Sequence, residues 1–268
     1  IFINKRKMKS IISIAFLLQA IINAVNLTTA QFPEEPVFRC RNTGNYTPSS
    51  DYSRNLKAAL DAVGKVKKYS GGSFSSSNGV KEAAYAVALC SGVAIKWGGN
   101  CNDCITRLTT SLQAKCPNQK EGVMLGSDCM IRYSDRKIIG VKDDWVWILS
   151  PGLGTIFNKI QFDKGVIDLM TRLQGEAAGG TNKKDAFGTT TFPPNNSTIY
   201  GAMQCTSDLS KELCTKCLQS IIMSYHPCCG GIMAGRMYSP NCYFTFSMEE
   251  YKKWKYSSQW KSLPPKTL

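Results

Sequence analysis

Residues that support acid–base catalysis are scarce in this chain. Its 268 residues include a single histidine, His226, and only 19 acidic residues against 33 lysines and arginines. A cysteine–histidine nucleophile needs a free thiol opposed to the imidazole, whereas Cys228 is merely close to His226 in the chain. No pair of carboxylates stands out as the two groups of a glycosidase. We therefore expect a protein that is not an enzyme, in which His226 has a structural or surface role.

Long apolar runs are absent beyond the first 30 residues, so no later segment is expected to cross a bilayer. The one long run, residues 11–25, follows four cations at positions 5–9 and leads to small residues at 28–30. This pattern is typical of a secretory signal peptide, which we expect to start at Met8 and to be cleaved before Gln31. An N-terminal membrane anchor is the alternative. We therefore predict that residues 1–30 are a signal peptide and that the product is secreted.

Negative charge is also in short supply. The formal net charge is +14, and removal of residues 1–30, which carry four cations and no acidic residue, leaves +10. A positive charge of this size attracts polyanions, which outside a cell are acidic polysaccharides and anionic membrane surfaces rather than nucleic acid. No dense run of lysine and arginine selects one of them, so a generally basic soluble surface is the alternative. Residues 254–268 form a basic, aromatic tail that either extends freely or packs on the body.

Cysteine, in contrast, is abundant, and ten of the twelve cysteines fall in a spacing that occurs twice. In both copies eleven residues separate the third cysteine from the fourth, and twelve separate the fourth from the fifth. This repeat predicts two copies of one module, and secretion predicts that the cysteines form disulfides. A zinc site or a redox-active CxxC is the less favoured alternative. The first copy holds Cys90, Cys101, Cys104, Cys116 and Cys129, and the second holds Cys205, Cys214, Cys217, Cys229 and Cys242.

The repeat predicts two domains, at residues 33–140 and 143–253, followed by the tail. In the first copy, Ser50 or Asp51 is expected to cap a helix with apolar residues at 56, 59, 60 and 63; residues 166–173 give a similar helix before Gly175. A second helix is expected near each CxxC. Stretches rich in small polar residues, at 70–79 and 179–197, predict turns or loops around short strands. With extended segments around 85–90, 122–133, 200–205 and 232–246, the order β–α–β–α–β–β indicates α+β domains, whose helices pack on one face of an antiparallel sheet.

Three sequons follow the predicted cleavage site. Secretion makes the asparagine of each Asn-x-Ser/Thr motif a candidate acceptor for an N-linked glycan. These asparagines are Asn45, Asn195 and Asn196.

The motif Cys205-x8-Cys214-x2-Cys217 resembles the ginkbilobin-homologous module, also called the stress–antifungal domain. The later segments Gly-Gly-Ile-Met-Ala-Gly-Arg236 and Cys242-Tyr-Phe-Thr-Phe support this resemblance, as do Tyr200-Gly and Asn55-Leu. The first copy is looser, with ten residues between Cys90 and Cys101. A signal peptide followed by two such modules is similar to the plant cysteine-rich repeat secretory proteins. The resemblance covers about residues 33–250 and implies two helices against a five-stranded antiparallel sheet in each domain.

The resemblance also implies a disulfide pattern: first cysteine with fifth, second with third, and fourth with sixth. The second copy has no cysteine at the first position, so Cys229 lacks its expected partner and its neighbour Cys228 is the odd one. We hypothesise a vicinal Cys228–Cys229 disulfide or a link outside the module, with two thiols as the alternative. The implied pairs are Cys40–Cys116, Cys90–Cys101, Cys104–Cys129, Cys205–Cys214 and Cys217–Cys242.

The related modules hold mannose through an asparagine after the first cysteine, an arginine seven after the fifth and a glutamate five after the sixth. The first copy has Arg41, Val123 and Ser134 at these positions, so none matches. The second copy keeps Arg236 and has Ser247 in place of the glutamate. Arg236 is therefore the one candidate for contact with a sugar, and a structural ion pair is its alternative role.

Together these observations favour a secreted, non-enzymatic recognition protein of the plant apoplast, acting in stress or defence responses. One alternative is a mannose-type antifungal lectin that binds cell-wall or fungal polysaccharide. A second is a partner of a receptor ectodomain of the same family, and a hydrolase is the least favoured. No cofactor, metal ion or nucleic acid is expected.

Overall fold

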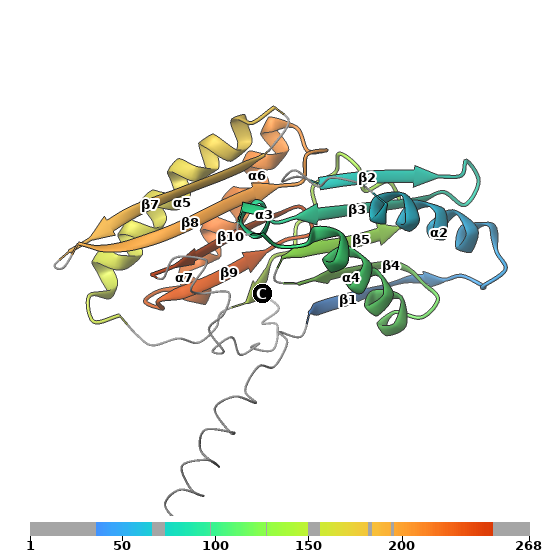
Figure 1. The fold of residues 1–268 in the computed structure, drawn as a ribbon, viewed down its shortest axis with the longest axis horizontal. Coiled ribbons are helices and arrows are strands. Elements are labelled where there is room, and N and C mark those ends of the chain that lie inside the picture. Colours follow the sequence, from blue (N-terminus) through green and yellow to red (C-terminus); the bar gives the residue numbers. More distant parts are fainter. Residues whose placement is uncertain are drawn as a thin grey trace, which may run out of the picture. The chain divides into compact units, whose positions relative to one another are not determined.

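Two five-stranded antiparallel sheets, each formed by one half of the chain, are the framework of the protein (Figure 1). The computed structural model describes residues 36–65, 73–96, 98–126, 128–149, 156–181, 184–193 and 196–248. The predicted signal peptide, the basic tail and Asn195 lie outside these residues. We call residues 36–134 module 1 and residues 147–248 module 2, and residues 135–146 the segment between the modules.

The described residues of module 1 form five strands, two long helices and one short helix. Its sheet has the strand order β1-β4-β5-β3-β2. The elements are β1 (Val37–Asn45), α2 (Asp51–Gly64), β2 (Ser73–Asn78), β3 (Ala84–Cys90), α3 (Gly92–Lys96), α4 (Cys101–Lys115), β4 (Gln119–Leu125) and β5 (Cys129–Ser134).

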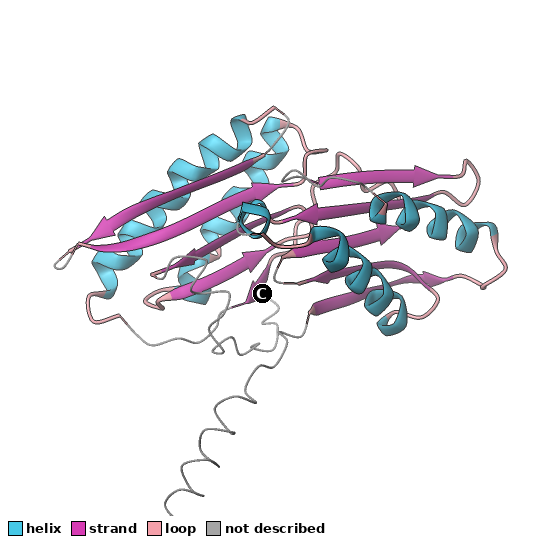
Figure 2. Cartoon of the chain, viewed as in Figure 1, coloured by secondary structure: helices cyan, strands magenta, loops and turns pink. Residues whose placement is uncertain are grey.

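Module 2 repeats this plan, with the corresponding strand order β6-β9-β10-β8-β7. The two sheets and their helices confirm the predicted fold of two tandem α+β domains (Figure 2). The elements are β6 (Trp147–Leu149), α5 (Lys159–Gly179), β7 (Asp185–Phe192), β8 (Ser197–Cys205), α6 (Lys211–Met223), α7 (Tyr225–Cys229), β9 (Ala234–Tyr238) and β10 (Cys242–Ser247).

The first long helix of each module forms because its apolar residues recur at helical spacing and face a sheet. In α2, Leu56, Ala59, Leu60 and Val63 are buried, and Ser50 caps the helix by accepting a hydrogen bond from the backbone N–H of Ser53. The equivalent residues of α5, 110 positions later, are Val166, Leu169, Met170 and Leu173, and all are buried in the core of module 2.

Helix α5 is longer than the sequence predicts. It continues through Gly175 to Gly179, so the expected end before Gly175 is wrong. A glycine inside a helix costs about 1 kcal/mol relative to alanine. The buried residues Ala177 and Ala178 extend the apolar stripe beyond the glycine, and their burial offsets that cost.

The polar stretches that predict turns or loops around short strands contain β2 and β7, the last strand in the order of each sheet. Their Ser- and Thr-rich sequences carry little apolar periodicity. With them each sheet has the five strands that the resemblance implies.

Both faces of the sheet in module 1 are covered. Ala88, Met124 and Ile131 belong to the core beneath the helices, whereas their chain neighbours Leu89 and Val123 belong to a separate apolar cluster on the opposite face. This second cluster contains Tyr238 and Tyr243 of module 2, so it joins the two modules.

In the described part of the chain, no helix has both the length and the apolar character to cross a membrane.

Candidate functional site

The structure pairs all twelve cysteines. Five of the six disulfides are the pairs that the resemblance implies, and the sixth joins Cys228 to Cys229. The cysteines of both CxxC motifs are therefore used as covalent links between helices and strands. Peptide mapping of the unreduced protein tests all six disulfides. The other pairs are Cys40–Cys116, Cys90–Cys101, Cys104–Cys129, Cys205–Cys214 and Cys217–Cys242.

The vicinal pair lies at the end of α7, where Cys229 is fully buried and Cys228 is partly exposed. The two Cα atoms are 3.7 Å apart, closer than in the five other pairs because the residues are neighbours in the chain. Beside them, the carboxylate of Asp163 accepts hydrogen bonds from the Tyr225 hydroxyl at 2.8 Å and from the Gly231 N–H at 2.7 Å. Burial, followed by the hydrogen bond to this carboxylate, raises the pKa of Tyr225.

The three positions that hold mannose in related modules have structural contacts in module 1. Arg41 pairs with Glu121 and Asp143, and Val123 lies in the apolar cluster between the modules. Ser134 is fully buried and accepts a hydrogen bond from the backbone N–H of Arg136. These contacts favour a structural role for this part of the sheet.

Arg41, Arg132 and Arg136 surround two carboxylates, Glu121 and Asp143, in a group that we call the arginine cluster. Arg136 donates two hydrogen bonds of 3.0 Å to Glu121, and Arg132 contacts Asp143 at 2.6 Å. Glu121 is 1 % exposed and Arg132 is 2 % exposed. Burial alone would raise the pKa of Glu121, but the hydrogen bond from Arg136 and the charges of the three arginines outweigh it, so this pKa is lowered.

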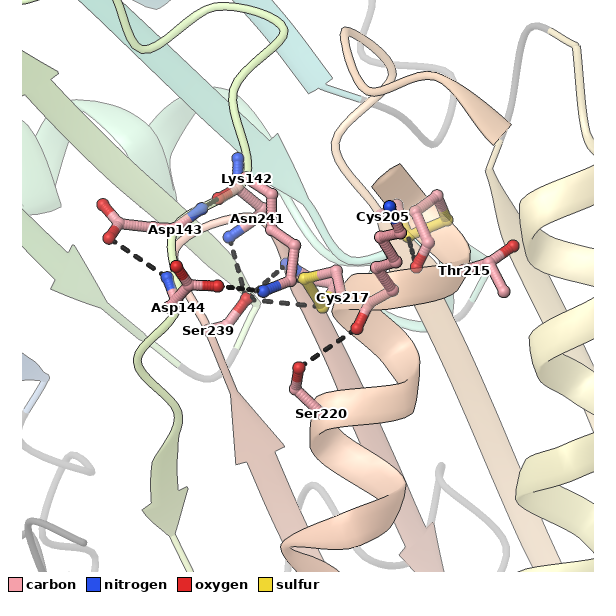
Figure 3. Close-up of a disulfide and its surroundings, with 12 residues drawn as sticks. Lys142, Asp143, Asp144, Cys205, Thr215, Cys217, Ser220, Ser239 and Asn241 are labelled. Atoms are coloured by element: carbon pink, nitrogen blue, oxygen red, sulfur yellow. Dashed lines mark hydrogen bonds and ion pairs between the residues drawn. A yellow bond between two sulfur atoms is a disulfide. The ribbon is translucent and has the colours of Figure 1, made fainter. Parts of the chain in front are cut away.

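The arginine cluster is connected to module 2 through Asn241. The side-chain oxygen of Asn241 accepts a hydrogen bond from the backbone N–H of Asp143 at 2.8 Å, and its amide nitrogen donates to the carbonyl of Val141 at 3.2 Å. The hydroxyl oxygen of Ser239 accepts a hydrogen bond from the backbone N–H of Asn241, and both residues are labelled in Figure 3. It also accepts one from the backbone N–H of Cys242, which holds the turn between β9 and β10 in place. The segment between the modules is thus bound on one side by arginines and on the other by an asparagine.

A second set of hydrogen bonds joins the modules beside the apolar cluster. Tyr243 is buried, and its hydroxyl contacts the hydroxyl of Ser91 at 2.8 Å and the side-chain oxygen of Gln204 at 3.0 Å. The Gln204 amide accepts from the Gly92 N–H and donates to the carbonyl of Cys90. Burial is the main reason that the pKa of Tyr243 is raised. The joint between the modules therefore combines apolar packing with paired polar groups.

Arg236 occupies a buried position in module 2. It is 3 % exposed and lies on β9, paired with Leu149 of β6 and with Thr245 of β10. Ser247, at the position of the family glutamate, is also buried. Burial of this arginine favours a structural role, and its contact with a sugar stays a prediction.

The remaining candidate residues lie at the surface. Asn45 and Asn196 are exposed, as a glycan acceptor must be, and their modification stays a prediction. His226 is exposed on α7, with its ring 5.5 Å from that of Tyr225. Neither the arginine cluster nor the Gln204 contacts was predicted, because residues scattered over several strands meet only when the sheets form.

Two joined, cystine-rich α+β modules define this chain as a tandem cysteine-rich domain protein. The salt stress response/antifungal family matches residues 39–136 and 154–249, which lie within the two predicted domains. The chain belongs to this family.

Several plant proteins are similar to the chain along most of its length. Cysteine-rich receptor-like protein kinase 29 of Arabidopsis thaliana is 31% identical over 86% of this chain. The matched region is only 34% of the length of that relative. Cysteine-rich repeat secretory protein 1 of the same plant is 29% identical, with 89% of this chain and 68% of the relative covered. The antimicrobial ginkbilobin-2-like protein of Castanea crenata is also 29% identical, over 86% of this chain and 92% of its own.

Solved structures share the fold. The tandem DUF26 ectodomain of the Arabidopsis thaliana cysteine-rich receptor-like protein PDLP5 has a TM-score of 0.58 at 22% identity, covering 81% of this chain and 99% of that one. The corresponding ectodomain of PDLP8 has a TM-score of 0.59 at 21% identity, with 79% and 96% covered.

Proposed function

We propose that this protein is a secreted, non-enzymatic recognition protein of the apoplast that acts in stress or defence responses. The observation that carries the proposal is the joint between the modules. There the buried charged and polar side chains have partners inside the protein: Glu121 pairs with Arg132, and Arg132 also contacts Asn241. Gln204 bonds to the backbone of Cys90 and of Gly92. A tandem body of this kind presents its binding groups on its outer surface.

The comparisons support this proposal. The family is described by salt stress response and antifungal action, and the relatives include a secretory and an antimicrobial protein. Other relatives are receptor-like kinases, so a receptor ectodomain of the same family is the protein partner that we would test first.

A binding screen tests the proposed function. Mature protein from a eukaryotic secretory host is immobilised and exposed to plant and fungal wall polysaccharides and to purified receptor ectodomains of the family, at low and high salt. We expect saturable binding to at least one of these that persists at high salt, because a specific site is screened less than long-range attraction. Binding to every polyanion that disappears at high salt would show electrostatic attraction only and would overturn the proposal.

A further inference from the structure

A groove of about 350 Å³ lies in module 1 between α2 and α4. This volume is within the range of pockets that hold small ligands. Figure 1 shows the two helices next to each other on the sheet. The groove is lined by Tyr46, Lys57, Leu60, Asp61, Thr109 and Gln113, among others.

The lining combines an apolar floor with polar walls. Leu56 and Leu60 are buried beneath the groove, and the half-buried ring of Tyr46 lies on the loop that precedes α2. A wholly apolar ligand would leave the polar walls without partners, which costs free energy. A sugar ring suits this lining better because it has an apolar face and an edge of hydroxyl groups.

Three polar side chains of the groove have no partner among the described residues. The ammonium group of Lys57 and the amide of Gln113 make no side-chain hydrogen bond or ion pair with any described residue. The hydroxyl of Thr109 is shielded from solvent and likewise has no partner in the described part of the chain. Asp61 has one weak pair, with Lys65 at 3.7 Å, and both of these side chains are exposed.

Module 2 shows that the fold does not require this groove. The residues equivalent to Lys57 and Thr109 are Ile167 and Ile222, and both pack against the core of module 2. The amide of Gln174 then bridges α5 and α6 by donating to the carbonyl of Thr215 at 2.9 Å. The same place is thus filled in one module and open, with unpaired polar groups, in the other.

We propose that the groove between α2 and α4 binds a uronic acid unit of an acidic polysaccharide. The carboxylate of the sugar pairs with Lys57, its hydroxyl groups bond to Gln113 and Asp61, and its apolar face lies against Tyr46. The positive net charge of the chain brings the polyanion to the surface. This inference rests on the proposed recognition function and names one ligand class for it.

The test is calorimetric titration of the mature protein with oligogalacturonate, and with manno-oligosaccharides of equal length as the neutral comparison. The variant Lys57→Ile/Thr109→Ile fills the groove with the residues that module 2 uses. We expect it to bind oligogalacturonate at least about tenfold more weakly, because a charge-assisted contact and the space are lost. Lys57→Arg keeps the charge and should retain binding.

Lys164→Ala is the matched control, since Lys164 is an exposed lysine on α5 of module 2 and its removal takes away one positive charge. It should bind like the wild type, and circular dichroism establishes that each variant is folded. Equal losses in Lys164→Ala and in the filled variant would overturn the inference by showing attraction to net charge alone. So would a folded filled variant that binds normally.

The screen described above separates this inference from the proposed function. A wild type that ignores oligogalacturonate but binds another glycan or a receptor ectodomain removes the uronate site and leaves the recognition function intact. A wild type that binds none of them removes both.

Discussion

The first strand is held in different ways in the two modules. In module 1, β1 has nine residues, and the disulfide Cys40–Cys116 ties it to the end of α4 across a sequence separation of 76. In module 2, β6 has three residues, and Cys229, the equivalent of Cys116, is bonded to the adjacent Cys228. Both sheets nevertheless keep the same strand order. One sheet design thus tolerates the loss of its longest covalent link.

In module 2, packing between the helices supplies part of the stabilisation that the Cys40–Cys116 disulfide supplies in module 1. Helix α5 has 21 residues, whereas its counterpart α2 has 14. The two long helices are also in more extensive contact in module 2 than in module 1. The groove in module 1 and the closed helix pair in module 2 are two outcomes of this difference. We infer that module 1 depends more on the Cys40–Cys116 disulfide and the arginine cluster, and that module 2 depends more on its packed core.

The largest effect should come from the long-range cystine. Replacing both Cys40 and Cys116 by alanine should lower the free energy of unfolding by about 4 kcal/mol, because the long loop of the unfolded chain is no longer closed. The same change at Cys228 and Cys229 should cost less than about 1 kcal/mol, since neighbours close almost no loop. Urea unfolding of the oxidised proteins measures both. Because Cys116 and Cys229 are equally buried, equal losses would point to sulfur packing instead of loop closure.

The second effect concerns the arginine cluster, which has no counterpart in module 2 because Ala234 and Thr245 replace Glu121 and Arg132 there. Glu121→Gln should lower stability by about 3 kcal/mol at pH 7, since breaking a buried ion pair leaves charges unpaired. Glu176→Gln, at an exposed pair on α5, is the control and should change stability far less. Urea unfolding at pH 7 compares the two.

The pH dependence sharpens this prediction. The pKa of Glu121 is lowered in the folded state. The charged form of Glu121 therefore adds its full contribution to the free energy of unfolding above pH 4.5, and this contribution is lost as the pH falls through the lower pKa of the folded state. The stability difference between wild type and Glu121→Gln should therefore shrink below pH 4.5. A difference that stays constant down to unfolding would rule out the charge of Glu121 as its source.

A smaller effect compares two buried tyrosines. Tyr52 in module 1 donates to the backbone carbonyl of Lys120 at 2.6 Å, and Tyr225 in module 2 donates to the carboxylate of Asp163 at 2.8 Å. Tyr225→Phe should cost about 2 kcal/mol and Tyr52→Phe about 1 kcal/mol, because hydrogen bonds to charged groups contribute more. Thermal unfolding of the two variants measures the order, and the reverse order would contradict it.

The smallest effect distinguishes the starts of the equivalent helices. Ser50 accepts a hydrogen bond from Ser53 at the start of α2, whereas Asn158 at the start of α5 makes no side-chain cap bond. Ser50→Ala should therefore lower stability by about 1 kcal/mol, and Asn158→Ala should have almost no effect. Denaturant midpoints resolve the two. A loss of similar size at Asn158 would show that α5 gains from a cap that its geometry does not contain.

The sequence predicts features that repeat or follow a period, and little else. The cysteine spacing predicts two modules, and the apolar positions of α2 and α5 predict their buried faces. The end of α5 was predicted wrongly because burial of Ala177 outweighs the local preference of Gly175. The arginine cluster and the groove depend on which side chains meet across strands and helices. No local pattern carries that information, so Glu121 and Lys57 could not be identified beforehand.

The vicinal link also has a consequence for how the nascent chain matures during secretion. Every cystine of module 2 joins residues at most 25 positions apart, so each can form as soon as a short stretch has entered the oxidising compartment. Module 1 must keep Cys40 reduced until Cys116 arrives, 76 residues later. During that interval Cys40 is exposed to wrong partners. An oxidoreductase that reshuffles thiols would therefore be needed for the first module far more than for the second.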